Sequence, residues 1–137
     1  MAVITEGIRA NDESGLCFGD YSVKAKLKVD GFEFGGDLYK VKTHDEVTRL
    51  EKNGTLLLET VPGAAIHNFT INEKTVAFAA EGQEDTQITL ELEPETEYTI
   101  FLSGVNTGKM KTNVSGKVIF SAELTSAPSE IKIKKVI

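Results

Sequence analysis

The sequence has few of the residues from which catalytic and metal sites are usually built. It contains one cysteine, Cys17, two histidines, His44 and His67, and no tryptophan. A single cysteine forms no internal disulfide and builds no cysteine-based zinc site. Neither histidine belongs to a recognisable triad motif, and no G-x-S-x-G segment is present. We therefore assign no catalytic residue, metal or cofactor, and we expect structural or solvated roles for both histidines.

Long apolar runs and an excess of positive charge are also absent. No apolar run approaches the roughly 18 residues of a membrane helix. The net charge is −6, which makes a nucleic-acid partner unfavourable. The first residues, MAVITEGIRANDES, have no basic region and no long apolar region, so no secretory signal is predicted. We expect no membrane or nucleic-acid partner, and a location in the cytoplasm or export without a cleavable signal.

Residues that favour β-strands are abundant. Valine, isoleucine and threonine make up about a quarter of the 137 residues, and their branched side chains suit a pleated surface. About ten short apolar or alternating segments are separated by turn residues, which is typical of a sandwich or barrel. We predict an all-β fold, a β-sandwich with at most one short helix.

The first strand with clear alternation is predicted over residues 21–29. Asp30-Gly31 reads as a hairpin turn, and Gly35-Gly36 as a second turn before a strand at 38–43. A further turn is expected at 105–108. The later predicted strands are 55–61, 65–71, 75–81, 86–92, 98–103, 109–112, 117–124 and 130–137.

The segment between 43 and 54 has two interpretations. Thr43 and Glu46 have the spacing of a capping box, and Asn53-Gly54 would end a short helix. In the competing interpretation, Asn53-Gly54 is the turn of a β-hairpin. We favour the helix and keep the hairpin as the alternative.

The N-terminal residues are expected to form an arm. Val3, Ile4 and Ile8 are apolar, and the mostly polar segment 9–15 separates them from the rest. We place the arm at residues 1–15 and the sandwich domain at 16–137. Such an arm would bury its apolar side chains by pairing with a sheet edge, for which the final strand is a candidate. The edge would belong to another copy of the chain or, if the arm folds back, to the same copy.

The most specific local pattern is Leu92-Glu93-Pro94-Glu95-Thr96-Glu97-Tyr98. It resembles the L-x-P-x-T-x-Y segment of fibronectin type III domains, in which the tyrosine hydroxyl bonds back to the backbone at a corner between two sheets. The resemblance implies an immunoglobulin-like sandwich and gives Leu92, Pro94, Thr96 and Tyr98 structural roles at that corner.

Three segments resemble a group of small clostridial proteins that often carry the label endosialidase. They are GDLYKVKT at 36–43, ETVPG at 59–63 and EDTQITLELEP at 84–94. By that resemblance, a sialidase would hold the substrate carboxylate with three arginines and attack with a tyrosine. The chain has only Arg9 and Arg49, and lysine does not replace the bidentate guanidinium. We therefore expect no sialidase activity and assign no enzymatic role.

Acidic and aromatic residues leave two binding alternatives. Glu81, Glu84 and Asp85 surround a glycine, and such carboxylates suit calcium, although a solvated surface is the favoured interpretation. Tyr21 and Tyr39 are the rings most suited to an exposed carbohydrate platform, although core packing is the favoured interpretation for each.

The function predicted from these observations is non-enzymatic. We expect a self-associating structural or scaffold protein that acts through protein–protein contacts as a homo-oligomer. The alternative is a carbohydrate-binding accessory module with a glycan as its ligand.

Overall fold

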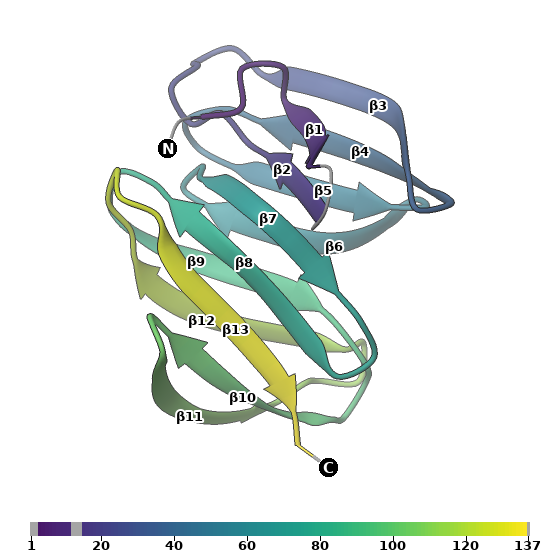
Figure 1. Cartoon of the computed structure of the whole chain (residues 1–137), viewed down its shortest axis with the longest axis vertical. Coiled ribbons are helices and arrows are strands. Elements are labelled where there is room, and N and C mark those ends of the chain that lie inside the picture. The colour runs from purple at the N-terminus through teal and green to yellow at the C-terminus, as the bar shows by residue number, and fades with distance from the viewer. Residues whose placement is uncertain (1–2, 12–14, 137) are drawn as a thin grey trace.

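The computed structural model describes residues 3–11 and 15–136, and every regular element in them is a β-strand. Two antiparallel sheets pack face to face, so the predicted all-β sandwich is confirmed (Figure 1). Within the described ranges, no helix is long and apolar enough to cross a membrane. The strands are β1 (Ile8–Asn11), β2 (Gly15–Phe18), β3 (Leu27–Phe34), β4 (Asp37–Thr43), β5 (Thr48–Lys52), β6 (Thr55–Val61), β7 (Ala65–Ile71), β8 (Thr75–Glu81), β9 (Asp85–Glu91), β10 (Glu97–Leu102), β11 (Val105–Lys111), β12 (Lys117–Glu123) and β13 (Ser129–Lys135).

The two sheets differ by one strand. The seven-stranded sheet has the order β1-β2-β7-β8-β13-β10-β11, and the six-stranded sheet has the order β12-β9-β6-β5-β4-β3. Strands β1 and β3 lie at one margin of the sandwich, and β11 and β12 lie at the other. The extra strand leaves β11 at the lower margin of the molecule (Figure 1).

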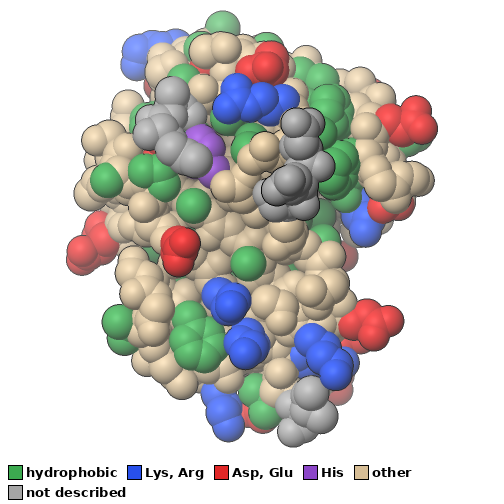
Figure 2. Space-filling view, in the orientation of Figure 1, with side chains coloured by type: hydrophobic (Ala, Val, Ile, Leu, Met, Phe, Trp, Pro, Cys, Tyr) green, Lys and Arg blue, Asp and Glu red, His purple; other side chains and the backbone are tan. Residues whose placement is uncertain are grey.

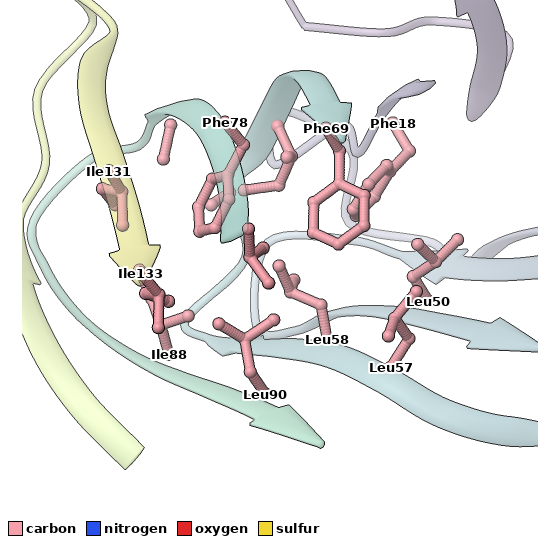
Figure 3. Packing of buried hydrophobic residues seen from close by; sticks show 14 of the residues in the cluster. Phe18, Leu50, Leu57, Leu58, Phe69, Phe78, Ile88, Leu90, Ile131 and Ile133 are labelled. Carbon is pink, nitrogen blue, oxygen red and sulfur yellow. The ribbon is translucent and has the colours of Figure 1, made fainter. Parts of the chain in front are cut away.

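The core lies between the inner faces of the sheets. Side chains that alternate inward from β6 and β9, such as Leu58 and Leu90, meet Phe69, Phe78 and Ile133 of the seven-stranded sheet (Figure 3). All five are buried. Each fully buried aliphatic or aromatic side chain contributes about 1.5–3 kcal/mol, so the alternation of apolar residues is the main source of stability.

The predicted short helix is wrong, and the alternative hairpin is what forms. Strands β5 and β6 pair, and the turn between them is Asn53-Gly54, whose φ angles of 51° and 83° suit a hairpin turn. Leu50 of β5 is fully buried in the sheet core. The Thr43 hydroxyl bonds to the Thr48 hydroxyl at 2.8 Å. Tertiary burial of Leu50 therefore overrides the local capping signal.

The strand predicted at 21–29 is only partly correct. Strand β3 begins at Leu27, and the chain turns before it because the Asp20 carboxylate accepts the Ser22 N–H at 2.9 Å. Asp30-Gly31 is a bulge inside β3, where the register with β4 shifts, rather than a hairpin turn. The Gly35-Gly36 turn is confirmed.

The turn expected at 105–108 is wrong. Strand β11 begins at Val105, and the hairpin turn is Ser103-Gly104, where both residues have positive φ. The strands predicted at 55–61, 65–71 and 75–81 match β6, β7 and β8.

The described part of the N-terminal segment does not form a separate arm. Ile4 and Ile8 are 0% and 3% exposed, whereas Val3 is half-buried. Strand β1 pairs with β2, and the Ile4 N–H donates to the Gly19 carbonyl at 3.0 Å. The segment thus folds back onto its own chain, which satisfies its backbone and buries its apolar side chains. Residues 1–2 and 12–14 of the predicted arm lie outside the described residues.

The final strand is not a sheet edge, contrary to expectation. Strand β13 lies between β8 and β10 and pairs with both. Ile131 and Ile133 are buried in the core, so the strand is held on both sides and on its inner face.

The tyrosine corner is present. Tyr98 is 4% exposed, and its hydroxyl accepts the Glu93 N–H at 3.3 Å. Leu92 packs against the core. The Thr96 hydroxyl donates to the Pro94 carbonyl at 2.9 Å. The four residues predicted for the corner therefore lie together where the chain passes from β9 to β10.

A second residue, Thr112, also stabilises the corner, and the sequence pattern did not indicate it. The Thr112 hydroxyl accepts the Thr96 N–H at 2.9 Å and donates to the Glu93 carbonyl. Thr112 is 3% exposed, so it replaces water for two backbone groups of the crossing segment.

We expect Tyr98→Phe to lower the free energy of unfolding by about 0.5–1.5 kcal/mol, because one hydrogen bond is lost and the ring stays packed. Thr112→Val should cost more, about 1–3 kcal/mol, because two backbone groups lose their partner. Urea denaturation with constant slope measures both. An unchanged midpoint for Tyr98→Phe would count against the corner.

Two buried threonines that face each other across β5 and β6 differ in their bonding. Thr48 and Thr60 are register partners and are both fully buried. The Thr48 hydroxyl donates to the Ala64 carbonyl at 2.8 Å and accepts the Ala64 N–H at 3.1 Å. The Thr60 hydroxyl has no hydrogen-bond partner among the described residues.

Opposite effects are therefore expected for the same change at the two positions. Thr60→Val should stabilise the fold by about 1 kcal/mol, because an unpaired buried hydroxyl is removed. Thr48→Val should destabilise it by about 1–3 kcal/mol, because the groups of Ala64 lose their partner. Thermal and urea unfolding of both variants provides the measurement. A loss of stability in Thr60→Val would show that this hydroxyl is satisfied in solution.

Candidate functional site

Tyr21 belongs to a network of three polar side chains. Its hydroxyl donates to Glu81 Oε2 at 2.9 Å, and His67 Nε2 shares a hydrogen bond with Glu81 Oε1 at 2.6 Å. Glu81 and His67 come from the neighbouring strands β8 and β7 and are each 2% exposed. Glu81 therefore links Tyr21 to His67 through its two carboxyl oxygens.

This network links separate parts of the fold. Both oxygens of Glu81 are hydrogen-bonded to side chains of the protein, and Glu81 and His67 are buried. The bond to Glu81 fixes the segment after β2 to the seven-stranded sheet. The expectation of a solvated Glu81 is wrong, because its carboxylate is turned into this network.

The network also changes the ionisation of Tyr21. Burial, followed by the hydrogen bond to the Glu81 carboxylate and the negative charges of Glu81 and Asp20, raises the pKa of Tyr21 from 10.0 to about 12. An unfolded tyrosine loses its proton near pH 10. The Tyr21 contribution to stability is therefore present below pH 10 and is lost as the pH rises through about 12.

Alkaline titration tests this arrangement. In the tyrosinate absorbance, we expect Tyr21→Phe to lack a group that titrates near pH 12 in the wild-type protein. The wild-type protein unfolded in denaturant is the control, because all its tyrosines should titrate near their ordinary pKa of about 10. If the group missing from the folded variant titrates near pH 10, the bond to Glu81 does not form.

Tyr39 packs in the core, as the favoured interpretation expects, and is not the exposed platform of the binding alternative. It lies on β4, is 6% exposed and packs against the core. Tyr21 lies shortly after β2, which ends at Phe18, whereas Tyr39 lies near the first residue of β2, Gly15. The structure therefore does not bring the two tyrosines together.

Tyr39 does line a cleft between the two sheets. The cleft has a volume of about 400 Å³ and opens between strands β1, β2 and β7 on one side and β3, β4 and β5 on the other. Its lining residues are Asn11, Gly15, Leu16, Phe34, Gly35, Asp37, Tyr39, Lys52, Phe69, Thr70 and Ile71. Sequence patterns could not reveal it, because these residues come from six strands and are far apart along the chain.

The charged groups of the cleft compensate each other. Lys52 Nζ lies 3.6 Å from Asp37 Oδ2, and the Asn53 side-chain amide donates to Asp37 Oδ1 at 2.9 Å. Burial, and to a smaller degree the charge of Asp37, raises the pKa of Tyr39 above its ordinary value.

His44, Asp45 and Glu46 form a group with metal-ligand chemistry. Their donor atoms lie within 4.8 Å of one another, and His44 is buried rather than solvated. Lys24 already pairs with Asp45 at 3.3 Å. This hydrogen bond, with a smaller effect of His44, lowers the pKa of Asp45.

The acidic residues considered for calcium do not converge. Glu81 is buried against His67, whereas Glu84 and Asp85 are exposed. Across the ranges that the structure describes, the group around Asp45 is the one with three donor atoms close enough for an ion.

Comparison with protein-family models, curated proteins and solved structures gave no match. The resemblance to clostridial proteins labelled endosialidase stays a prediction.

Proposed function

We propose that this chain is a non-enzymatic β-sandwich that acts through protein–protein contacts and assembles with further copies of itself through β11. The supporting observation is that β11 is the outermost strand of its sheet and that all seven of its residues are exposed. A strand of this kind presents unpaired backbone donors and acceptors along its open side.

The backbone geometry identifies the groups available for pairing. The Thr112 N–H donates to the Thr96 carbonyl at 2.9 Å, and hydrogen-bonded pairs alternate along an antiparallel ladder. Lys109 and Lys111 therefore direct their N–H and C=O groups away from β10. The other sandwich margin is better protected, because β1 has four residues and β3 contains the bulge at Asp30-Gly31.

Exposed apolar side chains gather at the same margin. Of the six large apolar residues exposed in the described chain, four fall within fifteen consecutive positions on β11, β12 and the loop between them. They are Val105, Met110, Val114 and Ile119. We call these four residues the β11 margin. Removing them from water would favour association.

The charges favour a contact between unlike surfaces. Lys109 and Lys111 are exposed on β11, and Lys132 and Lys134 are exposed on β13, which lies on the other side of β10. The structure records no ion pair for these four lysines within its described part. Figure 2 shows basic side chains gathered on this lower part of the face. Pairing β11 with β11 of a second copy would oppose lysines. The net charge of −6 instead favours contact with an acidic surface of the next copy, which extends as a ring or a filament.

Blocking the edge without disturbing the sandwich tests the proposal. We expect Lys109→Pro to lower the mass measured by light scattering, because proline removes an outward N–H and leaves the bonds to β10 intact. Lys109→Ala is the matched control, because it removes the same charge and keeps the N–H. Circular dichroism checks folding of both variants. Equal association of the two variants would contradict edge pairing.

A second pair of variants tests the apolar contribution. Val105→Asp should weaken association, because a charge would be buried in the contact. Leu38→Asp should not, because Leu38 is 53% exposed but lies on β4, away from the β11 margin. A wild-type chain that stays monomeric at all concentrations would overturn the proposed function.

A further inference from the structure

Strand β12 is a second open edge at the same margin as β11. Among the described strands it is the outermost one of the six-stranded sheet, and its seven residues pair with β9 without a register shift. Strand β11 also has seven residues, so the two edges match in length. The edges at the other margin match β11 less well, because β1 has four residues and β3 contains a register shift.

The backbone of β12 has groups that point away from β9. The Leu92 N–H donates to the Gly116 carbonyl at 2.7 Å, and hydrogen-bonded pairs alternate along an antiparallel ladder. Ile119 and Ser121 therefore direct their N–H and C=O groups to the open side. The Lys117 carbonyl confirms this alternation, because it accepts an N–H from the loop before β12 at 3.1 Å.

The two sheets form a step at this margin. Met110 of β11 is the register partner of the core residue Tyr98, and residues directly opposite each other share a face, so Met110 points inward. Met110 is nevertheless 38% exposed, whereas Val118 and Ala122 on the inner face of β12 are 2% and 7% exposed. The inner face of β11 is therefore open where that of β12 is covered. In Figure 1, β11 lies below β12 at the lower end of the molecule.

The charge of the β12 edge complements that of β11. Strands β9 and β12 together carry three carboxylates, on Asp85, Glu91 and Glu123, and one lysine, Lys117. Asp85 and Glu123 are exposed register partners, so two like charges stand opposite each other. Lysines brought to this edge by β11 of a second copy would reduce that repulsion.

We propose that β11 of each copy pairs with β12 of the other, so that the ring of copies closes at two. This inference rests on the proposed assembly through β11 and names the strand that receives it. Because β11 and β12 lie at the same margin, the contact that joins β11 of the first copy to β12 of the second also joins β12 of the first to β11 of the second. A two-fold axis relates the two halves of such a contact, and no edge at this margin stays open.

The steps of the two copies fit into each other in this dimer. The seven-stranded sheet of one copy continues into the six-stranded sheet of the other. The projecting β11 of each copy then covers the open inner face of the other β11, which removes Met110 from water.

Proline at an outward position of β12 tests the pairing. We expect the wild-type protein to reach twice the chain mass of 14.9 kDa in light scattering and to grow no further as the concentration rises. Ser121→Pro should raise the dissociation constant of the dimer at least about tenfold, because two symmetry-related hydrogen bonds are lost while the bonds to β9 remain. Ser121→Ala is the matched control, because it keeps the N–H. Circular dichroism checks that both variants fold.

Cross-linking tests the fit of the steps without a change to the backbone. Met110→Cys, treated with a short bismaleimide, should give a covalent species of two chains and none larger. Leu38→Cys is the control, because Leu38 is 53% exposed on β4 at a distance from this margin. The native Cys17 is buried and present in both variants, so it does not account for a difference.

The outcomes separate this inference from the proposed function. The inference is overturned if the mass grows beyond two chains, if Ser121→Pro associates as tightly as Ser121→Ala, or if Met110→Cys gives no covalent dimer. If Lys109→Pro dissociates the assembly and Ser121→Pro does not, assembly through β11 stands and its partner is another strand. A wild-type chain that stays monomeric at all concentrations overturns both.

Discussion

The structure depends on each sheet covering the apolar inner face of the other. Leu58 and Leu90 on one side and Phe69 and Phe78 on the other are buried where the two sheets meet. Neither sheet could keep such a face in water, since each side chain would forfeit about 1.5–3 kcal/mol. At the margins, the two sheets differ in the number and the length of their strands.

The two margins have different consequences. At one margin, short β1 faces long β3, and the gap becomes a cleft with rings and a compensated ion pair. At the other, the seventh strand of the larger sheet is exposed along its whole length, with apolar and basic side chains beside it. An open strand edge, unlike such a cleft, offers its backbone to another chain.

Local sequence patterns predicted the structure correctly where the alternation of apolar residues and the flanking turn residues indicated the same element. The alternation in β6, β7 and β8 and the corner at Tyr98 are examples, because they rest on neighbouring residues. Asp30-Gly31 and Thr43 misled because the same residues suit more than one structure. Their outcome was decided by pairing with β4 and by burial of Leu50, which lie outside the local segment.

The sequence by itself determined the strand-rich fold class, the scarcity of residues suited to catalysis and the tyrosine corner at Tyr98. Composition and short-range spacing carry that information. Only the tertiary structure decided that Ile4 and Ile8 fold back, that β13 is internal and that β11 is the open edge. It alone joined Tyr21 to Glu81 and placed Tyr39 in a cleft. These features depend on which strands become neighbours, and that choice is made by burial summed over the whole core rather than by any local pattern.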